Sequence, residues 1–154
     1  MSININIQNA STVKSLPTNE KIELWAKQAL DKQHKDAEIT LRIVDEEEGK
    51  LLNKNWRNKD YATNVLSFPA GEIIEHAPNF LGDIVICAPV VEREAQEQEK
   101  EINAHWAHLI VHGILHLQGY DHEEEEEADK MESLEILILN KIGYTNPYET
   151  ELQE

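Results

Sequence analysis

Residues 112–122 have the sequence HGILHLQGYDH, in which His112 and His116 precede Gly119 and His122 follows it. Positions four apart on an α-helix are offset by about 40° and by about 6 Å along the axis, so His112 and His116 project from one face. A continuous helix would carry His122 out of reach. Gly119 can take the left-handed conformation that ends a helix and reverses the chain toward the first two histidines. The segment therefore predicts a metal site at the end of a long helix.

Three neutral imidazoles suit Zn²⁺, and also Ni²⁺ or another late divalent ion, with coordination positions left for water or substrate. A structural zinc would usually close its shell with four protein ligands, often thiolates. The only cysteine is Cys87, which belongs to a separate apolar run. The ligand set thus indicates a catalytic metal and favours a metal-dependent hydrolase.

The same spacing occurs in the metzincin proteases as HExxHxxGxxH, where the glutamate is the general base. Gly113 occupies the glutamate position here, which disfavours a peptidase. Asp83 and Asp121 could orient an imidazole, but ordinary turn or capping roles are the simpler interpretation. His105 and His108 share the helical stripe with the motif, and we interpret them as half-buried members of that stripe.

Outward from this motif, the chain alternates extended and helical patterns without an internal repeat. The fold class predicted is α+β (mixed α/β), with a central, roughly four-stranded sheet packed against several helices and a metzincin-like helix and turn. The whole chain, 1–154, is expected to form a single metal-dependent hydrolase domain with a loosely ordered tail from about residue 145. The predicted strands cover residues 3–7, 38–44, 64–68 and 83–87, and residues 70–80 are expected to be a loop.

The predicted helices begin at polar capping residues. Thr18 is expected to cap a helix over residues 19–34, and Asp45 a second helix that contains Leu51 and Leu52. A long helical pattern follows Pro89 as far as residue 118, with a break near Asn103, and a last helix covers residues 124–141. The acidic run at 123–127 is explained by the favourable position of negative charge in the first turn of that helix.

Net charge is −16, from 14 basic and 30 acidic residues, so the chain as a whole should repel nucleic acid. Residues 50–59, KLLNKNWRNK, contain Lys50, Lys54, Arg57 and Lys59 but no acid. This local positive segment suits phosphate binding, and the planar guanidinium of Arg57 can hold a phosphate with two hydrogen bonds. Trp56 could stack on an unpaired base, but it is equally compatible with a core position.

The N-terminal segment lacks the continuous apolar run of a signal peptide, and no later run is long enough to span a bilayer. A single cysteine suits a reducing compartment. We therefore predict a cytoplasmic protein without a membrane partner.

Three segments together resemble the YbeY family of bacterial metal-dependent endoribonucleases: NKNWRNKDYATNVLSFP at 53–69, LGDIVIC at 81–87, and HGILHLQGYDH. The resemblance implies a single-strand-specific ribonuclease that acts in 16S rRNA 3′-end maturation and in ribosome quality control. Its expected partners are single-stranded or ribosomal RNA and the small ribosomal subunit, with no DNA expected. Many members carry Asp where this chain has Asn64.

By the same resemblance, His112, His116 and His122 are the metal ligands, and Arg57 is a functional residue. We accordingly predict His112 and Arg57 as catalytic residues, and Arg57, Lys54 and Lys59 as substrate-binding residues. Two alternatives stay open, namely a metalloprotease-like or other metallohydrolase and a non-catalytic, zinc-stabilised ribosome-assembly factor. The sequence does not decide the native metal, the cleavage position, the general base, whether water or a 2′-hydroxyl attacks, the protein partners or the oligomeric state.

Overall fold

The computed structural model of the chain describes residues 4–31, 36–70, 79–120 and 124–148, and the following account concerns these residues. Four strands form one mixed sheet in the order β1-β2-β4-β3. Their bounds are β1 Asn4–Asn9, β2 Glu38–Val44, β3 Val65–Pro69 and β4 Phe80–Cys87. β1, β2 and β4 are mutually parallel, and β3 is an antiparallel edge strand beside β4. The predicted α+β class and four-stranded sheet are confirmed.

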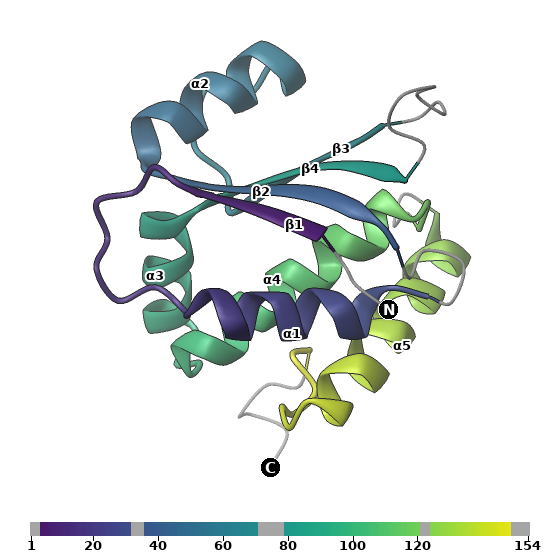
Figure 1. The fold of residues 1–154 in the computed structure, drawn as a ribbon. Coiled ribbons are helices and arrows are strands. Elements are labelled where there is room, and N and C mark those ends of the chain that lie inside the picture. Colours follow the sequence, from purple (N-terminus) through teal and green to yellow (C-terminus); the bar gives the residue numbers. More distant parts are fainter. Residues whose placement is uncertain (1–3, 32–35, 71–78, 121–123, 149–154) are drawn as a thin grey trace.

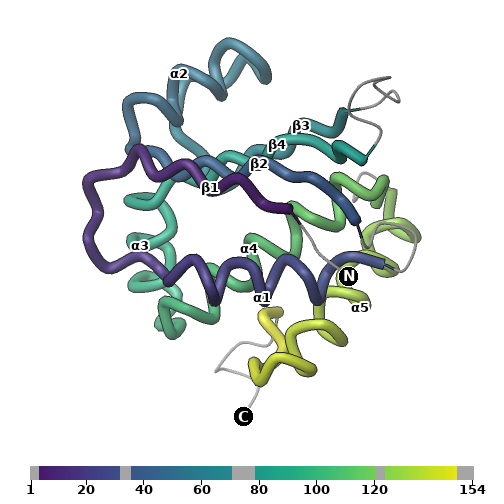
Figure 2. The backbone as a smooth tube through the Cα atoms, in the orientation of Figure 1, coloured from purple at the N-terminus to yellow at the C-terminus, as the bar shows by residue number. Residues whose placement is uncertain are grey.

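Five helices surround the sheet in the described part of the chain: α1 Asn19–Ala29, α2 Glu46–Arg57, α3 Ala88–Glu97, α4 Ile102–Leu117 and α5 Glu125–Lys141. α1 and α4 cover one face of the sheet, and α2 lies alone on the opposite face (Figure 1). α1 connects the parallel strands β1 and β2, and the backbone trace shows it crossing below the sheet in this view (Figure 2). β4 runs directly into α3. α5 packs against α4 on the side away from the sheet.

Alternation along β4 divides the core between these two faces, because successive side chains of a strand point to opposite sides. Ile84 and Ile86 belong to the large cluster shared with α1, α4 and α5. Val85 and Cys87 belong to the small cluster beneath α2. A fully buried aliphatic side chain contributes about 1.5–3 kcal/mol, so the larger cluster dominates the stability of the fold.

α4 is the central helix, and three of its large side chains, Trp106, Ile110 and Ile114, are fully buried. It crosses the sheet closely at Gly113, where an added Cβ would lie 3.1 Å from the Cδ1 atom of Ile84. Position 113 therefore faces the sheet. A carboxylate at this position would be pressed against an aliphatic side chain, which is a physical reason for glycine where metzincins have glutamate.

The helix starts agree with the sequence in part. Thr18 caps α1, since its Oγ1 accepts a hydrogen bond from the backbone N–H of Lys21 at 3.2 Å. Asp45 holds the N-cap position of α2, but the prediction of a side-chain cap is wrong. Its carboxylate instead accepts hydrogen bonds from Ser11 and Thr12, which lower the pKa of Asp45 and tie the loop after β1 to the end of β2.

Several predicted boundaries shift by a few residues. α1 ends at Ala29 rather than at 34, and the residues from 32 to 35 lie outside the described chain. The long helix is divided as expected, with α3 ending at Glu97 and α4 beginning at Ile102. β4 begins at Phe80, so the predicted loop ends earlier than expected.

Candidate metal centre

The C-terminal end of α4 is closed by a turn at Gly119, which has a φ of 100°. The backbone N–H of Gly119 donates to His116 O at 3.0 Å, and that of Tyr120 donates to Leu115 O at 3.1 Å. These two bonds form the Schellman arrangement, which satisfies carbonyl groups left over at a helix end. The chain leaves the helix axis one turn after His116.

His112 and His116 lie together on one face of α4, with ring centroids 4.6 Å apart and ring planes at 81°. Both are partly exposed, so a solvent ion can reach them. The third predicted ligand, His122, lies outside the described residues. Within the described ranges no group of three His, Cys, Asp or Glu side chains could hold a metal ion. The triad therefore stays a prediction, of which the structure brings together two members.

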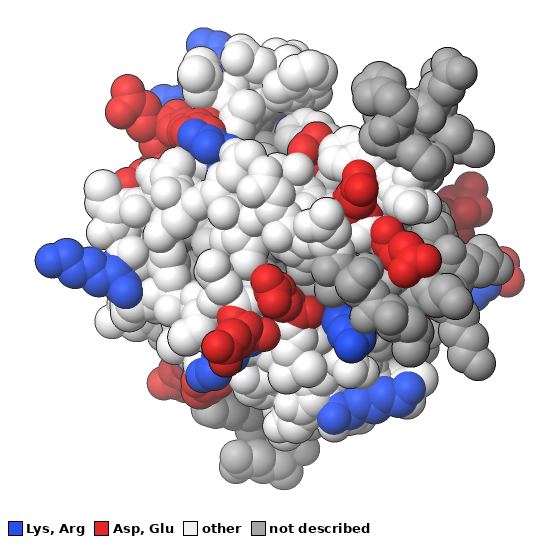
Figure 3. Space-filling view, viewed as in Figure 1, with Lys and Arg blue, Asp and Glu red and all other residues white. Residues whose placement is uncertain are grey.

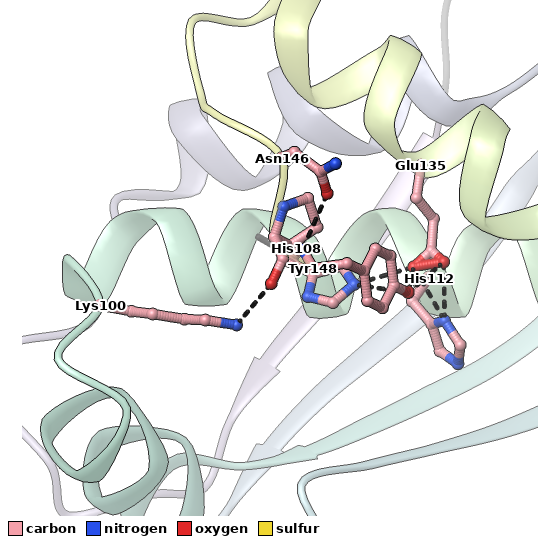
Figure 4. Close-up of polar contacts among 7 residues, drawn as sticks. Lys100, His108, His112, Glu135, Asn146 and Tyr148 are labelled. Atoms are coloured by element: carbon pink, nitrogen blue, oxygen red, sulfur yellow. Dashed lines mark hydrogen bonds and ion pairs between the residues drawn. The ribbon is translucent and has the colours of Figure 1, made fainter. Parts of the chain in front are cut away.

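Glu135, on α5, lies directly behind His112 and is fully buried. Its carboxylate accepts hydrogen bonds from His112 Nδ1 at 3.2 Å, from His108 Nε2 at 2.8 Å and from the Tyr148 hydroxyl at 2.7 Å. Figure 4 shows the three donors around this one carboxylate, with the second ring nitrogen of His112 on the far side of the ring. With Nδ1 engaged, Nε2 is the atom that would bind a metal. This donor set fits a divalent metal ion.

The electrostatics of this cluster favour an ionised carboxylate. Burial by itself would raise the pKa of Glu135, but the hydrogen bonds and charges of His108 and His112 outweigh it and lower that pKa from 4.5 to about 2. Burial raises the pKa of Tyr148, and its bond to Glu135 raises it further. The Tyr148 hydroxyl therefore acts as a neutral donor to a charged acceptor.

The segment after α5 reaches this cluster through Tyr148. The Tyr148 ring packs edge-on against His108, with centroids 5.3 Å apart. Lys100 Nζ donates to Pro147 O at 3.1 Å, and Tyr148 N donates to Asn146 Oδ1 at 2.8 Å (Figure 4).

The sequence predicts a loosely ordered tail from about residue 145. That boundary stays a prediction, since residues 149–154 are outside the described chain.

Glu135 and Tyr148 were not among the site residues predicted from sequence. A signal existed for Glu135, which occupies a position of the buried stripe of α5 together with Met131, Ile138 and Leu139. A glutamate within an apolar stripe needs a buried partner. Tyr148 gave no comparable signal, because its contact depends on how the chain folds back after α5.

A third histidine of α4, His105, also pairs with a glutamate. His105 Nε2 donates to Glu94 Oε1 on α3 at 2.9 Å, and Asn64 Nδ2 donates to the same oxygen at 3.0 Å. The bond from His105 and that from Asn64 lower the pKa of Glu94 against the effect of burial. His105 and His108 are thus both engaged with carboxylates, and Asn64 links β3 to α3.

The predicted RNA-binding residues Lys54, Arg57 and Lys59 gather at the end of α2, and all are exposed. α2, which ends at Arg57, lies on the opposite face of the sheet from α4, which carries His112 (Figure 1). Lys50, at the other end of the positive segment, forms an ion pair of 3.8 Å with Asp60. In Figure 3 acidic and basic side chains lie together at the upper left, over α2, and the surface toward the far end of that helix is mostly uncharged in this view.

Trp56 stands in the middle of this group with 69% of its surface exposed, so the core position considered for it is wrong. Its indole packs in a T-shaped arrangement with the ring of Phe68 on β3, with centroids 5.9 Å apart and ring planes at 66°. The ring therefore lies at the surface and packs against an aromatic side chain of the sheet edge. An exposed, oriented aromatic ring among basic side chains is typical of surfaces that bind unpaired bases.

The family model described as endoribonuclease YbeY matches residues 5–143, almost the whole described chain. This chain belongs to the YbeY endoribonuclease family. Membership confirms the resemblance drawn from the three sequence segments. It also confirms the predicted class of enzyme, a hydrolase of the endoribonuclease type.

Relatives named endoribonuclease YbeY align along nearly their full lengths. The chain is 52% identical to the protein of Methylobacillus flagellatus, covering 96% of this chain and 94% of that one. It is 52% identical to the Stutzerimonas stutzeri protein, over 99% and 95%, and 49% identical to that of Pseudomonas savastanoi pv. phaseolicola, over 95% and 88%. The solution structure of TM1509 from Thermotoga maritima superposes with a TM-score of 0.59 at 26% identity, covering 93% and 99%.

The YbeY family is metal-dependent, and the paired histidines of α4 agree with that requirement. Which metal ion is bound, and by which residues, stays a prediction. Among the described helices, none has both the length and the apolar character needed to cross a bilayer.

Proposed function

We propose that this chain is a metal-dependent endoribonuclease that cuts single-stranded RNA during maturation of the 16S rRNA 3′ end and in ribosome quality control. The endoribonuclease activity follows from the family. The observation that carries the metal dependence is the pairing of His112 and His116 at 4.6 Å beside a helix-ending turn. Two imidazoles on one helical face form half of a typical histidine-rich metal site.

His112 and His116 would hold the ion, and His122 would complete the set once the chain turns at Gly119. Zn²⁺ is the ion best suited to three imidazoles, and Ni²⁺ or another late divalent ion also fits. When bound, such an ion neutralises charge that develops on the scissile phosphate and lowers the pKa of a bound water. His112 is accordingly proposed as a catalytic residue in the sense that it would hold the ion against the substrate.

Arg57, Lys54 and Lys59 are proposed to bind the RNA backbone. Their charges offset the overall net charge of −16 at one place on the surface. Arg57 can hold one phosphate with two parallel hydrogen bonds, which would fix the strand relative to the sheet. Trp56 would stack on an adjacent base.

The arrangement of these groups supports a preference for single strands. The basic end of α2 and the histidines of α4 lie on opposite faces, and β3 is the edge of the sheet on that side. An RNA that touches both would have to bend around an edge of the sheet, which requires a flexible backbone. Stacking on Trp56 also requires an unpaired base.

The ribosomal RNA substrate and the small subunit are proposed as partners, since an acidic protein gains little from nonspecific contact with nucleic acid. No DNA partner is proposed, because the family is one of endoribonucleases. A cytoplasmic location without a membrane partner is also proposed, as the sequence predicts.

The test compares Zn²⁺-loaded wild type with His112→Ala and Arg57→Ala on three substrates: single-stranded RNA, duplex RNA and casein. We expect cleavage of single-stranded RNA only, with a loss of at least about 100-fold in each variant, as for other removals of a transition-state contact. Equal cleavage by wild type and both variants would identify a contaminant. Cleavage of casein would instead support a metalloprotease, and Zn²⁺ binding without any cleavage would support an assembly factor.

A further inference from the structure

We propose that Glu135 is the positioning residue for His112, and that Tyr148 fixes Glu135 in that role, so that the segment after α5 is part of the metal centre. This inference deepens the proposed function and rests on it. It assigns roles to two residues that lie outside the histidine motif, one on α5 and one beyond its end.

The contacts of Glu135 are those expected of a carboxylate with a fixed task. The residue has 0% of its surface exposed, and both of its oxygens accept hydrogen bonds. Tyr148 donates to both oxygens, at 2.7 and 2.9 Å, and His108 donates to one of them at 2.8 Å. The carboxylate is held by these two donors independently of His112. It therefore offers His112 a fixed acceptor.

This acceptor determines the form of the His112 ring. A carboxylate has no proton to give, so the proton of the shared hydrogen bond resides on His112 Nδ1. The lone pair of the neutral ring is then on Nε2, which lies across the ring from Glu135 (Figure 4). An imidazole fixed in this tautomer and orientation loses less conformational entropy when it binds a metal ion than a ring that rotates freely.

The buried negative charge of Glu135 also requires compensation by hydrogen bonds or positive charge. A buried carboxylate is costly unless it is paired, and in the described part of the chain Glu135 accepts hydrogen bonds from His108, His112 and Tyr148. A divalent cation held by His112 would place positive charge one ring away from Glu135. The carboxylate and the ion would therefore stabilise each other through His112.

Tyr148 couples this arrangement to the C-terminal segment. Its ring packs on His108, so replacement by phenylalanine removes the hydroxyl and leaves the packing in place. Tyr144, in the same segment, packs edge-on against Trp25 with centroids 6.2 Å apart. Tyr144→Phe is therefore a matched control for Tyr148→Phe.

A matched control also exists for Glu135. Glu94 accepts a hydrogen bond from His105 at 2.9 Å, and His105 lies about two helical turns before His112 on α4. Glu94→Gln disturbs a carboxylate and histidine pair of the same kind on the same helix. It leaves the ring of His112 untouched, so it reports the general structural cost of losing such a pair.

The experiment measures Zn²⁺ affinity of the full chain by competition with a chromophoric chelator, for wild type and the four variants. We expect Glu135→Gln to weaken binding about 10- to 100-fold and Tyr148→Phe about fivefold. Glu94→Gln and Tyr144→Phe should stay within about twofold of wild type, although Glu94→Gln also lowers thermal stability. ¹⁵N NMR of the metal-free protein should show His112 protonated at Nδ1 in wild type and a mixture of tautomers in Glu135→Gln.

Equal Zn²⁺ affinities of Glu135→Gln and Glu94→Gln, or an unchanged His112 tautomer in Glu135→Gln, would overturn the positioning role. Should Glu135→Gln not fold, the pair Tyr148→Phe and Tyr144→Phe decides in the same way. A wild-type protein that takes up no Zn²⁺ would overturn the proposed metal centre itself. That failure is distinguishable, because it appears in the wild type before any variant is compared.

Discussion

Gly119 and Gly143 end α4 and α5 in the same conformation, with φ angles of 100° and 96°. The N–H of Gly119 donates to His116 O at 3.0 Å, and that of Gly143 donates to Asn140 O at 3.2 Å. At both positions an added Cβ would meet no atom within 4 Å. The two glycines thus share a backbone requirement and differ in position, since only Gly119 follows the paired histidines.

Replacing either glycine by alanine should cost about 1–2 kcal/mol of unfolding free energy, because an L-residue is strained at this φ and no steric clash adds to it. Gly119→Ala should in addition weaken Zn²⁺ binding by tenfold or more, since the proposed third ligand, His122, follows this turn. Gly143→Ala should leave Zn²⁺ affinity within about twofold. Urea titrations and chelator competition measure the two effects separately.

Equal losses of Zn²⁺ affinity in both alanine variants would mean that the effect is one of general stability. An unchanged Zn²⁺ affinity in Gly119→Ala would show that this turn does not contribute to metal binding. Either result would leave the family and the fold untouched.

Trp56 should contribute to RNA affinity far more than to stability, because 69% of its surface is exposed and its contact with Phe68 is an edge contact. Stacking on one base is worth about 1–3 kcal/mol, so Trp56→Ala should weaken binding of a short single-stranded RNA by about 5- to 150-fold. Leu51 is a suitable control on the same helix, since it is 57% exposed and apolar. Fluorescence anisotropy at fixed salt checks the prediction, and an equal effect of Leu51→Ala would contradict base stacking.

Arg57 should act on RNA affinity through a phosphate contact. Arg57→Ala is expected to reduce the slope of log affinity against log salt by about 0.7, the value for one phosphate of a single strand. Lys27, an exposed lysine in the last turn of α1, provides a control of equal charge away from α2. A slope that changes equally in Lys27→Ala would show that net charge alone is responsible.

Much of the fold follows from local sequence patterns. The alternation in residues 38–44 predicts β2 without error, and the polar residue before each apolar stripe places the starts of α1 and α2. These features depend on neighbours within a few positions of the chain. The division between α3 and α4 was expected for the same reason, since the helical pattern weakens between Glu97 and Ile102.

The parts that could not be predicted depend on contacts between distant residues. The carboxylate of Asp45 binds Ser11 and Thr12 rather than its own helix, and no pattern near Asp45 reveals that the loop after β1 passes there. Glu135 meets His112 only because α5 folds back on α4. The exposure of Trp56 likewise follows from the placement of α2 alone on its face of the sheet.

The last prediction concerns the pair of Glu94 and His105, which connects α3 to α4. The hydrogen bond from His105 lowers the pKa of Glu94 below its usual value of 4.5 in the folded chain. A group with a lowered folded pKa stabilises the protein above its unfolded pKa, and that stabilisation is lost as the pH falls through the folded pKa. Glu94 should therefore contribute to stability at pH 6 and lose that contribution below about pH 4.5.

Glu94→Gln should lower the urea midpoint at pH 6 and make the midpoint fall less steeply from pH 5 to pH 3, because the variant has no carboxylate to protonate there. Glu97, exposed at the end of α3, offers a control substitution in the same helix. Parallel pH profiles for wild type and Glu94→Gln would show that this bond does not stabilise the fold. A profile altered equally by Glu97→Gln would assign the acid dependence to overall charge, because that variant changes the net charge of α3 without touching His105.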